Sequence, residues 1–167
     1  MVITIDSMIW IYNYDPYAPE SKNVKNWLRG TDGALQSHEQ IVLSTIIPLE
    51  VLHSICKKPS VDFTTAYNAA LGIIALANVI LVDFDTRLLA KSMTLLGDYR
   101  TYGIGERDAS ILATMKDRNV VEIATHDENI LAIPDFFRID PVFSPPLTLD
   151  VDESFDEEKF GILLSEI

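Results

Sequence analysis

Short apolar runs alternate with longer amphipathic stretches along this chain, and the alternation predicts its secondary structure. Runs rich in β-branched residues indicate buried strands, which we expect at residues 2–5, 41–44, 79–82 and 120–124, with a last strand at 136–139. The stretches between them predict helices at 8–12, 20–28, 45–57, 62–77, 85–96, 108–118 and 127–131. Strands separated by helix-length segments imply βαβ units, so we expect an α/β fold with a central, mainly parallel sheet flanked by helices.

Four acidic residues stand where such a fold would gather them. Asp6 directly follows the first predicted strand and Asp127 closely follows the fourth, whereas Glu50 and Asp108 lie on predicted helices. An acid just past the carboxyl end of a parallel strand faces the crevice where open α/β sheets bind ligands. Clustered carboxylates repel one another unless a cation neutralises them, and Mg²⁺ or Mn²⁺ prefers such oxygen ligands. The pattern predicts a metal-dependent nuclease with these four acids as metal ligands and catalytic residues.

Each acid taken alone also has a structural explanation. Asp6 and Asp127 are suited to cap helices, Glu50 to an exposed helix position, and Asp108 to a helix start, where the macrodipole favours negative charge. One shared site explains the four in this order better than four separate coincidences do. Three neighbouring polar residues are expected to lie outside the site: Glu106, His126 and Glu128.

The charge of the chain argues against a nucleic-acid enzyme. Its 167 residues, enough for one domain with a substantial core, carry a net charge of −12. Residues 150–167 hold seven acids against Lys159 alone and so account for −6, which leaves −6 for residues 1–149. A nucleic-acid enzyme usually has a basic footprint, and here basic residues are only local, at Lys22, Lys25 and Arg29 on one predicted helix, at 57–58, and at Arg100 and Arg107. A solvated surface is the simpler interpretation of each.

The four acids fall within four short segments whose order and spacing are informative. In chain order these are ITIDS at 3–7, STIIPLEV at 44–51, GERDASILA at 105–113 and IATHDENIL at 123–131. Their combination resembles the PIN-domain family, and within it the small VapC-like ribonucleases of prokaryotes. The resemblance covers residues 1 to about 140, and the third and fourth segments carry most of its specificity.

The resemblance implies a three-layer PIN-like fold and hydrolysis of RNA phosphodiester bonds. It assigns Asp6, Glu50, Asp108 and Asp127 to an acidic quartet that binds one or two Mg²⁺ or Mn²⁺ ions. Two hydroxyl residues, Ser7 and Thr125, would support the site by hydrogen bonding. Arg107 is a candidate for contact with the scissile phosphate, although an ion pair with Asp108 also explains it.

The resemblance also implies partners and a domain boundary. RNA is the expected substrate, and a toxin of this kind would have an antitoxin-type protein inhibitor. Apolar positions on the outer faces of predicted helices favour a homodimer. We expect a PIN-like domain at 1–145 and an acidic C-terminal extension at 146–167, either a solvated tail or a terminal helix that docks through Phe160, Ile162, Leu163 and Leu164. A further hypothesis is that this acidic extension covers a basic groove and competes with RNA.

Two other functions remain open, and a third lacks the residues it needs. A non-catalytic PIN-like module that binds RNA or a protein would keep the same fold. A dehalogenase-type phosphatase is suggested by Asp83-Phe84-Asp85-Thr86, but Arg87 stands where that motif expects Thr or Val. A phosphorylatable receiver domain would need an acidic pair after its first strand and a lysine after its last, and neither is evident.

No run is apolar and long enough to span a membrane, and a single cysteine, Cys56, fits a reducing, cytoplasmic location.

Overall fold

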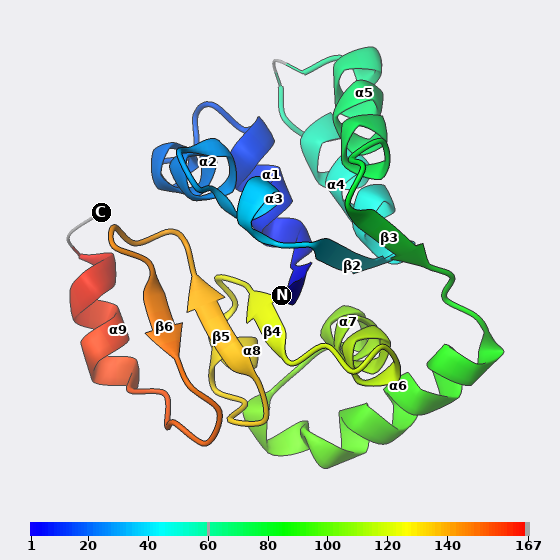
Figure 1. Cartoon of the computed structure of the whole chain (residues 1–167), viewed down its shortest axis with the longest axis vertical. Helices are drawn as coiled ribbons and strands as arrows, with labels where there is room; N and C mark the ends of the chain where they lie inside the picture. Colours follow the sequence, from blue (N-terminus) through cyan, green and yellow to red (C-terminus); the bar gives the residue numbers. More distant parts are fainter. Residues whose placement is uncertain (60, 166–167) are drawn as a thin grey trace.

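The computed structural model describes residues 1–59 and 61–165, and its centre is one twisted sheet (Figure 1). Within this part of the chain the sheet has six strands in the order β3-β2-β1-β4-β5-β6. The first five run parallel, and β6 pairs antiparallel with β5. The strands are β1 Val2–Ile5, β2 Gln40–Ser44, β3 Val79–Val82, β4 Glu122–Ala124, β5 Phe137–Asp140 and β6 Leu147–Leu149. The predicted α/β class with a mainly parallel sheet is confirmed.

Helices cover both faces of this sheet. In the view of Figure 1, α1, α2, α4 and α5 lie on one side of the strands, and α6 and α7 lie on the other. The helices are α1 Ser7–Tyr14, α2 Ser21–Arg29, α3 Ala34–Ser37, α4 Ile46–Cys56, α5 Phe63–Ile74, α6 Thr86–Asp98, α7 Glu106–Asp117, α8 Glu128–Leu131 and α9 Glu157–Leu164, with a 3₁₀ turn, η1, at Arg100–Tyr102. The sheet therefore has a helical layer on each face, as the three-layer prediction required.

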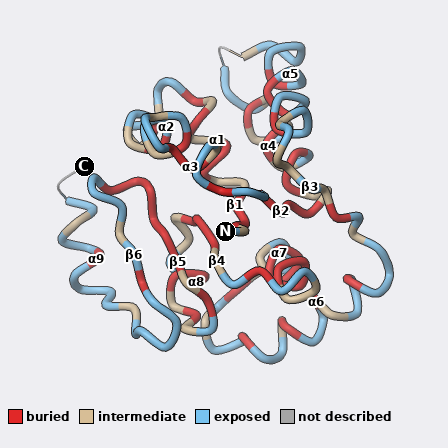
Figure 2. The backbone as a smooth tube through the Cα atoms, in the orientation of Figure 1, coloured by how far each residue is buried: buried red, intermediate tan, exposed pale blue. Residues whose placement is uncertain are grey.

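The core follows the strands and the inner helix. Figure 2 shows buried backbone along the central strands and along α7. Ile3 and Ile5 of β1 are fully buried, as are Ile41 and Leu43 of β2. In α7 every residue from 109 to 115 is buried. Removing each large aliphatic side chain from water contributes about 1.5–3 kcal/mol, so β1 and α7 are rigid supports for the residues at their ends.

Some element boundaries differ from those predicted. Helix α7 begins at Glu106 rather than at Asp108, because the Gly105 amide donates to Asp108 Oδ2 at 2.8 Å and so starts the helix two residues earlier. Thr45 stands before α4 but does not cap it; its hydroxyl accepts from the Phe84 amide at 3.2 Å. None of the described helices combines the length and apolar character that a membrane span requires.

The C-terminal segment is folded onto the domain instead of being a solvated tail. Strand β6 extends the sheet, and Phe160 of α9 is 3% exposed in a small cluster with Phe143 and Leu149. Ile162, by contrast, is 58% exposed, so only part of the predicted apolar face docks. Fully buried Arg138 donates to the carbonyls of Leu131, Asp150 and Glu153 at 2.6–2.8 Å. This arginine ties the extension to β5. The domain boundary at 145/146 stays a prediction.

Candidate functional site: an acidic crevice at the carboxyl ends of β1 and β4

The region at the carboxyl ends of β1 and β4, where open α/β sheets bind ligands, is called the acidic crevice below. Ile5 of β1 lies opposite Ala124 of β4, and the Asp6 amide donates to the Ala124 carbonyl at 2.9 Å. Asp6 is only 5% exposed, and its carboxylate accepts hydrogen bonds from Ser7 Oγ at 3.2 Å and Thr125 Oγ1 at 2.9 Å. Asp6 stands at the N-cap position of α1, but its side chain makes no capping hydrogen bond, so side-chain capping does not explain this carboxylate.

Thr125 connects the ends of the two strands. Its fully buried hydroxyl donates to Asp6 Oδ2 and accepts from the Asp127 amide at 3.0 Å. Asp127 in turn caps α8, because its carboxylate accepts from the Asn129 amide at 2.8 Å and the Ile130 amide at 3.4 Å. The cap explanation therefore holds for Asp127, yet the same turn sets it within electrostatic reach of Asp6.

Glu50 reaches the crevice from α4. Both of its carboxylate oxygens are buried, and neither has a hydrogen-bond partner among the described residues. The nearest cation is Arg107, whose Nε lies 3.3 Å from Glu50 Oε1 in an ion pair that does not have hydrogen-bond geometry. Arg107 therefore pairs directly with Glu50 and not with Asp108, the partner considered from the sequence.

Asp108 completes the set from α7. Its Oδ2 accepts from the Gly105 amide, which fixes one side of the carboxylate at the first turn of the helix. Burial raises the pKa of Asp108, the Gly105 amide lowers it, and the charge of Asp127 raises it. Asp108 thus serves the helix start and the crevice together.

The electrostatics of the crevice reflect burial and crowding of like charges. The pKa of Asp6 rises from 3.8 to about 6, first because of burial, against the Thr125 hydrogen bond, and further because of Asp108, Asp127 and Glu50. Burial likewise raises the pKa of Glu50, and the nearby Ser7 hydroxyl and the charge of Arg107 partly offset this rise, although the hydroxyl donates to Asp6 and not to Glu50. Because all three other acids act on Asp6, the fold brings the four carboxylates predicted from the sequence into one neighbourhood.

The donor set fits a hard divalent cation in its chemistry. It consists of carboxylates that destabilise one another, including a buried glutamate whose two oxygens lack hydrogen-bond donors, and Mg²⁺ or Mn²⁺ prefers oxygen ligands of this kind. The distances between these side chains do not yet match a metal site. Among the described residues, no three acids, histidines or cysteines lie close enough together to hold one ion. The carboxylates are thus neighbours, and coordination would require their side chains to rotate toward one another.

Tyr12 and His126 border the crevice without joining the acids. His126 Nδ1 lies 2.7 Å from Oδ2 of the fully buried Asp140, so the imidazole ring is directed toward β5. This orientation agrees with the expectation that His126 lies outside the group of four acids. The Tyr12 ring meets the His126 ring edge-on at 6.0 Å. Burial raises the Tyr12 pKa to about 12, with contributions from Glu20, Asp140 and Asp6. The contact between His126 and Asp140 could not be predicted from the sequence, because it depends on the pairing of β4 with β5 and no local motif indicates it.

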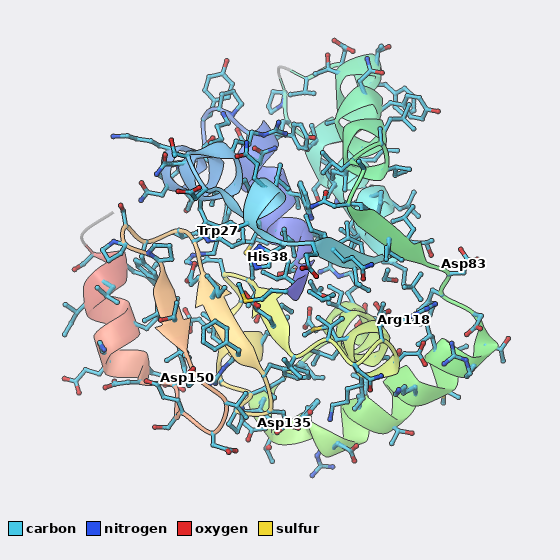
Figure 3. All side chains as sticks on the ribbon, in the orientation of Figure 1. Trp27, His38, Asp83, Arg118, Asp135 and Asp150 are labelled. Atoms are coloured by element: carbon cyan, nitrogen blue, oxygen red, sulfur yellow. The ribbon has the colours of Figure 1, made fainter. Side chains whose placement is uncertain are left out.

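The aspartates of the phosphatase-like motif lie elsewhere. Asp83 follows the edge strand β3, far from β4 in the sheet order, and Figure 3 shows it where the chain leaves that strand toward α6. Asp85 caps α6 by accepting from the Leu88 amide at 2.8 Å. A strand end and a helix cap therefore explain this motif.

An α/β fold with carboxylates near the carboxyl ends of its central strands has the arrangement in which open α/β sheets bind ligands, and comparison with known families identifies the fold. The profile of the PIN domain matches residues 3–135. The chain therefore belongs to the PIN domain family, which confirms the resemblance seen in the sequence. A search of curated proteins found no match.

Solved structures support the same fold. The Mycobacterium tuberculosis toxin VapC20, described as cleaving the sarcin–ricin loop, aligns with a TM-score of 0.61 at 12% identity over 72% of this chain and 86% of its own. FitAcB from Neisseria gonorrhoeae gives 0.60 at 21% over 83% and 97%. VapBC2 from Rickettsia felis, bound to a promoter DNA fragment, gives 0.58 at 18% over 83% and 97%. At these identities the likeness concerns the fold.

Proposed function

We propose that this protein is a metal-dependent endoribonuclease that hydrolyses RNA phosphodiester bonds. The observation that carries the proposal is the proximity of Glu50, Asp108 and Asp127 to buried Asp6 in a PIN-domain fold, where burial first and then these like charges raise the Asp6 pKa. Such a set is costly to maintain without a cation and is suited to holding one. The similarity to VapC20, described as a toxin that cleaves the sarcin–ricin loop, favours RNA as the substrate.

In this proposal the four carboxylates hold one or two Mg²⁺ or Mn²⁺ ions. When bound, a divalent ion supplies Lewis-acid activation for attack of water on phosphorus. Thr125 orients Asp6 and, through the Asp127 amide, the turn that carries Asp127, while Ser7 donates to Asp6 beside Glu50. Arg107 neutralises Glu50 and, with its side chain 69% exposed, can turn to a phosphate oxygen of the substrate.

The decisive experiment is RNA cleavage with Mn²⁺ added to protein freed of metal. Cleavage by the wild-type protein that disappears in Asp6→Asn and in Asp108→Asn supports the proposal. The matched control is Asp83→Asn, which removes the same charge outside the crevice and should leave cleavage intact. Cleavage that persists in both crevice variants would refute the assignment of the site.

A non-catalytic module is the second candidate, favoured by the absence, among the described residues, of three acids within ligand distance of one point. It predicts that no RNA is cleaved at any Mn²⁺ concentration, whether or not Mn²⁺ raises the melting temperature. A Mn²⁺-soaked crystal separates the two further, because an ion held by at least three of the four acids is expected only for a competent site.

We also propose that the protein is a toxin-type nuclease with protein partners. Structural neighbours include toxin–antitoxin complexes, such as one from Klebsiella pneumoniae that aligns with a TM-score of 0.58 at 19% identity over 83% of this chain and 97% of its own. Helix α5 supports protein contact, since it exposes apolar side chains along its length: Phe63, Tyr67, Leu71 and Ile74. Induced expression should arrest bacterial growth in the wild type and not in Asp6→Asn.

Self-association is the partner prediction most easily tested. We expect a homodimer in light scattering of the protein alone, and Tyr67→Glu with Leu71→Glu should convert it to a monomer. Met93→Glu on α6, another exposed apolar position at 66%, is the control that should leave the dimer intact. An antitoxin-type inhibitor would then be a second chain that binds with or without loss of the dimer.

A further inference from the structure

Helix α2 carries three of the basic residues that the sequence alone explains as solvated surface. The surroundings of the helix indicate a more specific role for them. Lys22, Lys25 and Arg29 follow at spacings of three and four, so they share one side of the helix, and all three are exposed. The buried residues of the helix, Val24 and Leu28, face the core. The helix contains no acidic residue, although the chain has 25 acids against 13 lysines and arginines.

Most other cations of the described chain are already neutralised by carboxylates. Lys58 pairs with Asp15, Arg107 with Glu50 and Lys116 with Asp135, while Asp117 gathers three cations: Arg87, Lys91 and Arg118. No ion pair within the described residues involves Lys22, Lys25 or Arg29 (nor Lys57, Arg100 and Lys159, which lie on separate elements). Helix α2 is therefore where adjacent positive charges remain available to an external anion.

The basic side of α2 starts beside the acidic crevice. Helix α1 begins directly after Asp6, and α2 packs against it, with Arg29 Nε donating to Asn13 Oδ1 at 3.3 Å. Glu20, the residue before α2, lies near both rings at the crevice border. Burial raises the pKa of Tyr12 and the charge of Glu20 raises it further, whereas burial lowers the pKa of His126, which Asp140 and then Glu20 raise. The residue before α2 therefore lies near the crevice border, and Arg29 at the end of α2 lies beside the end of α1 that is remote from Asp6.

Two surface hollows flank these residues. Lys25 and Arg29 line one of about 540 Å³ together with Asn13, Tyr14 and Asn26. Lys22 lines another of about 640 Å³, whose far wall is formed by the loop after β5 and by Leu163 of α9. Cationic side chains on the rim of hollows lined by amide, phenol and proline groups suit a flexible polyanion whose bases need space beside its backbone.

We propose that Lys22, Lys25 and Arg29 of α2 bind the phosphate backbone of the RNA substrate as it leaves the carboxylate crevice. This inference rests on the proposed ribonuclease function and names the surface that holds its substrate. The axial rise from Lys22 to Arg29 is about 10 Å at 1.5 Å per residue, which allows contact with more than one phosphate of an extended strand. The basic footprint that the overall composition lacks is thus local.

The test measures how salt weakens binding of a fluorescently labelled single-stranded RNA, by anisotropy in EDTA so that metal-dependent cleavage is suppressed. Each phosphate neutralised on a single strand contributes about 0.7 to the slope of log K against log salt. The variant with Lys22→Gln, Lys25→Gln and Arg29→Gln should lose about 2 units of slope. Between about 50 and 200 mM salt, the wild type should therefore lose about 20-fold more affinity than the variant does.

The matched control is a second triple variant, with Lys57→Gln, Arg100→Gln and Lys159→Gln, which removes the same net charge from three scattered elements. It should keep the wild-type slope to within about one unit. The double variant Lys22→Gln with Lys25→Gln leaves the Arg29–Asn13 hydrogen bond intact and should lose about two thirds as much slope. In cleavage assays the α2 variants should raise KM while kcat stays unchanged.

The outcomes separate this inference from the proposed function. Equal slopes for the two triple variants, with a wild type that cleaves RNA, would overturn the role of α2 and leave the ribonuclease proposal standing. A wild type that neither cleaves RNA nor binds it with a salt-dependent affinity would overturn both.

Discussion

Replacing Asp6 by asparagine tests the electrostatic argument at its centre, because the amide keeps the shape of the side chain and removes its charge. The Asp6 pKa of about 6 lies about two units above its ordinary 3.8, mainly through burial and further through Asp108, Asp127 and Glu50. At about 1.4 kcal/mol per unit, the ionised carboxylate costs the metal-free fold about 3 kcal/mol at neutral pH. An asparagine removes this cost but leaves buried amide hydrogens without acceptors, at about 1–2 kcal/mol. We expect a net gain of about 1–2 kcal/mol.

The direction of the pH dependence follows from the sign of the shift. A carboxyl whose pKa is higher in the folded state contributes stability that is complete below about pH 4 and is lost as the pH rises through about 6. The metal-free wild-type protein should therefore lose stability across this window through Asp6, and Asp6→Asn should not. The advantage of the variant appears at neutral pH and becomes a deficit of about 1 kcal/mol near pH 4, where only the cost of the unpaired amide hydrogens remains.

Thermal unfolding in EDTA at several pH values measures this difference. For a domain of this size, 1–2 kcal/mol corresponds to a rise in melting temperature of about 2–8 °C at pH 7. Asp98→Asn on α6 removes one exposed charge and is the control for net charge. Adding Mn²⁺ should stabilise the wild type and reverse the ranking. An Asp6→Asn protein that melts below the wild type by the same amount at pH 4 and at pH 7 would refute the reasoning.

Three further predictions concern residues around the crevice and the extension. Thr125→Val should destabilise the fold by about 1–3 kcal/mol in urea unfolding, because the Asp6 carboxylate and the Asp127 amide lose their shared hydrogen-bond partner. Thr125→Ser keeps the hydroxyl and should retain most of the wild-type stability. Arg138→Met should expose the chain after residue 145 to limited proteolysis, since three carbonyls lose their donor; protection equal to that of the wild type would contradict this. Arg107→Gln removes the counter-charge of Glu50, so it should lower the stability of the metal-free protein by up to about 1 kcal/mol. For the same reason it should enlarge the rise in melting temperature that Mn²⁺ causes, and an unchanged rise would contradict this prediction.

The central strands and the gathering of the acids were predictable because both depend on simple geometry. Periodicity located β1 and β4, and parallel pairing brings the carboxyl ends of adjacent parallel strands to one edge, so Asp6 and Asp127 had to approach each other. Glu50 and Asp108 followed from the family pattern. The catalytic role of these acids stays a prediction, since nearness alone does not establish coordination.

The features that were missed depend on contacts between distant segments. Strand β6 is three residues long and exists because it pairs with β5, which no local pattern within 147–149 indicates. Arg138 stands in a strand pattern as an ordinary charged residue, but it is fully buried because its acceptors arrive from α8 and from the loop after β6. The ion pair of Arg107 with Glu50 likewise required the relative position of α7 and α4.

The distribution of charge, and not its sum, decides whether an acidic protein can bind RNA. At physiological ionic strength interactions between exposed charges fade beyond about 8 Å, so acids on α9 have little effect on a phosphate held at α2 unless the two elements adjoin it directly. Lys22 of α2 and Leu163 of α9 line one hollow, and the acidic first turn of α9 lies at the end of that helix opposite Leu163. Among the described residues of α9, apolar Leu163 lines the hollow, and the carboxylates of Glu157 and Glu158 lie in the first turn of the helix. The net charge of −12 is thus compatible with an RNA path, and competition between the extension and RNA is not required by the fold.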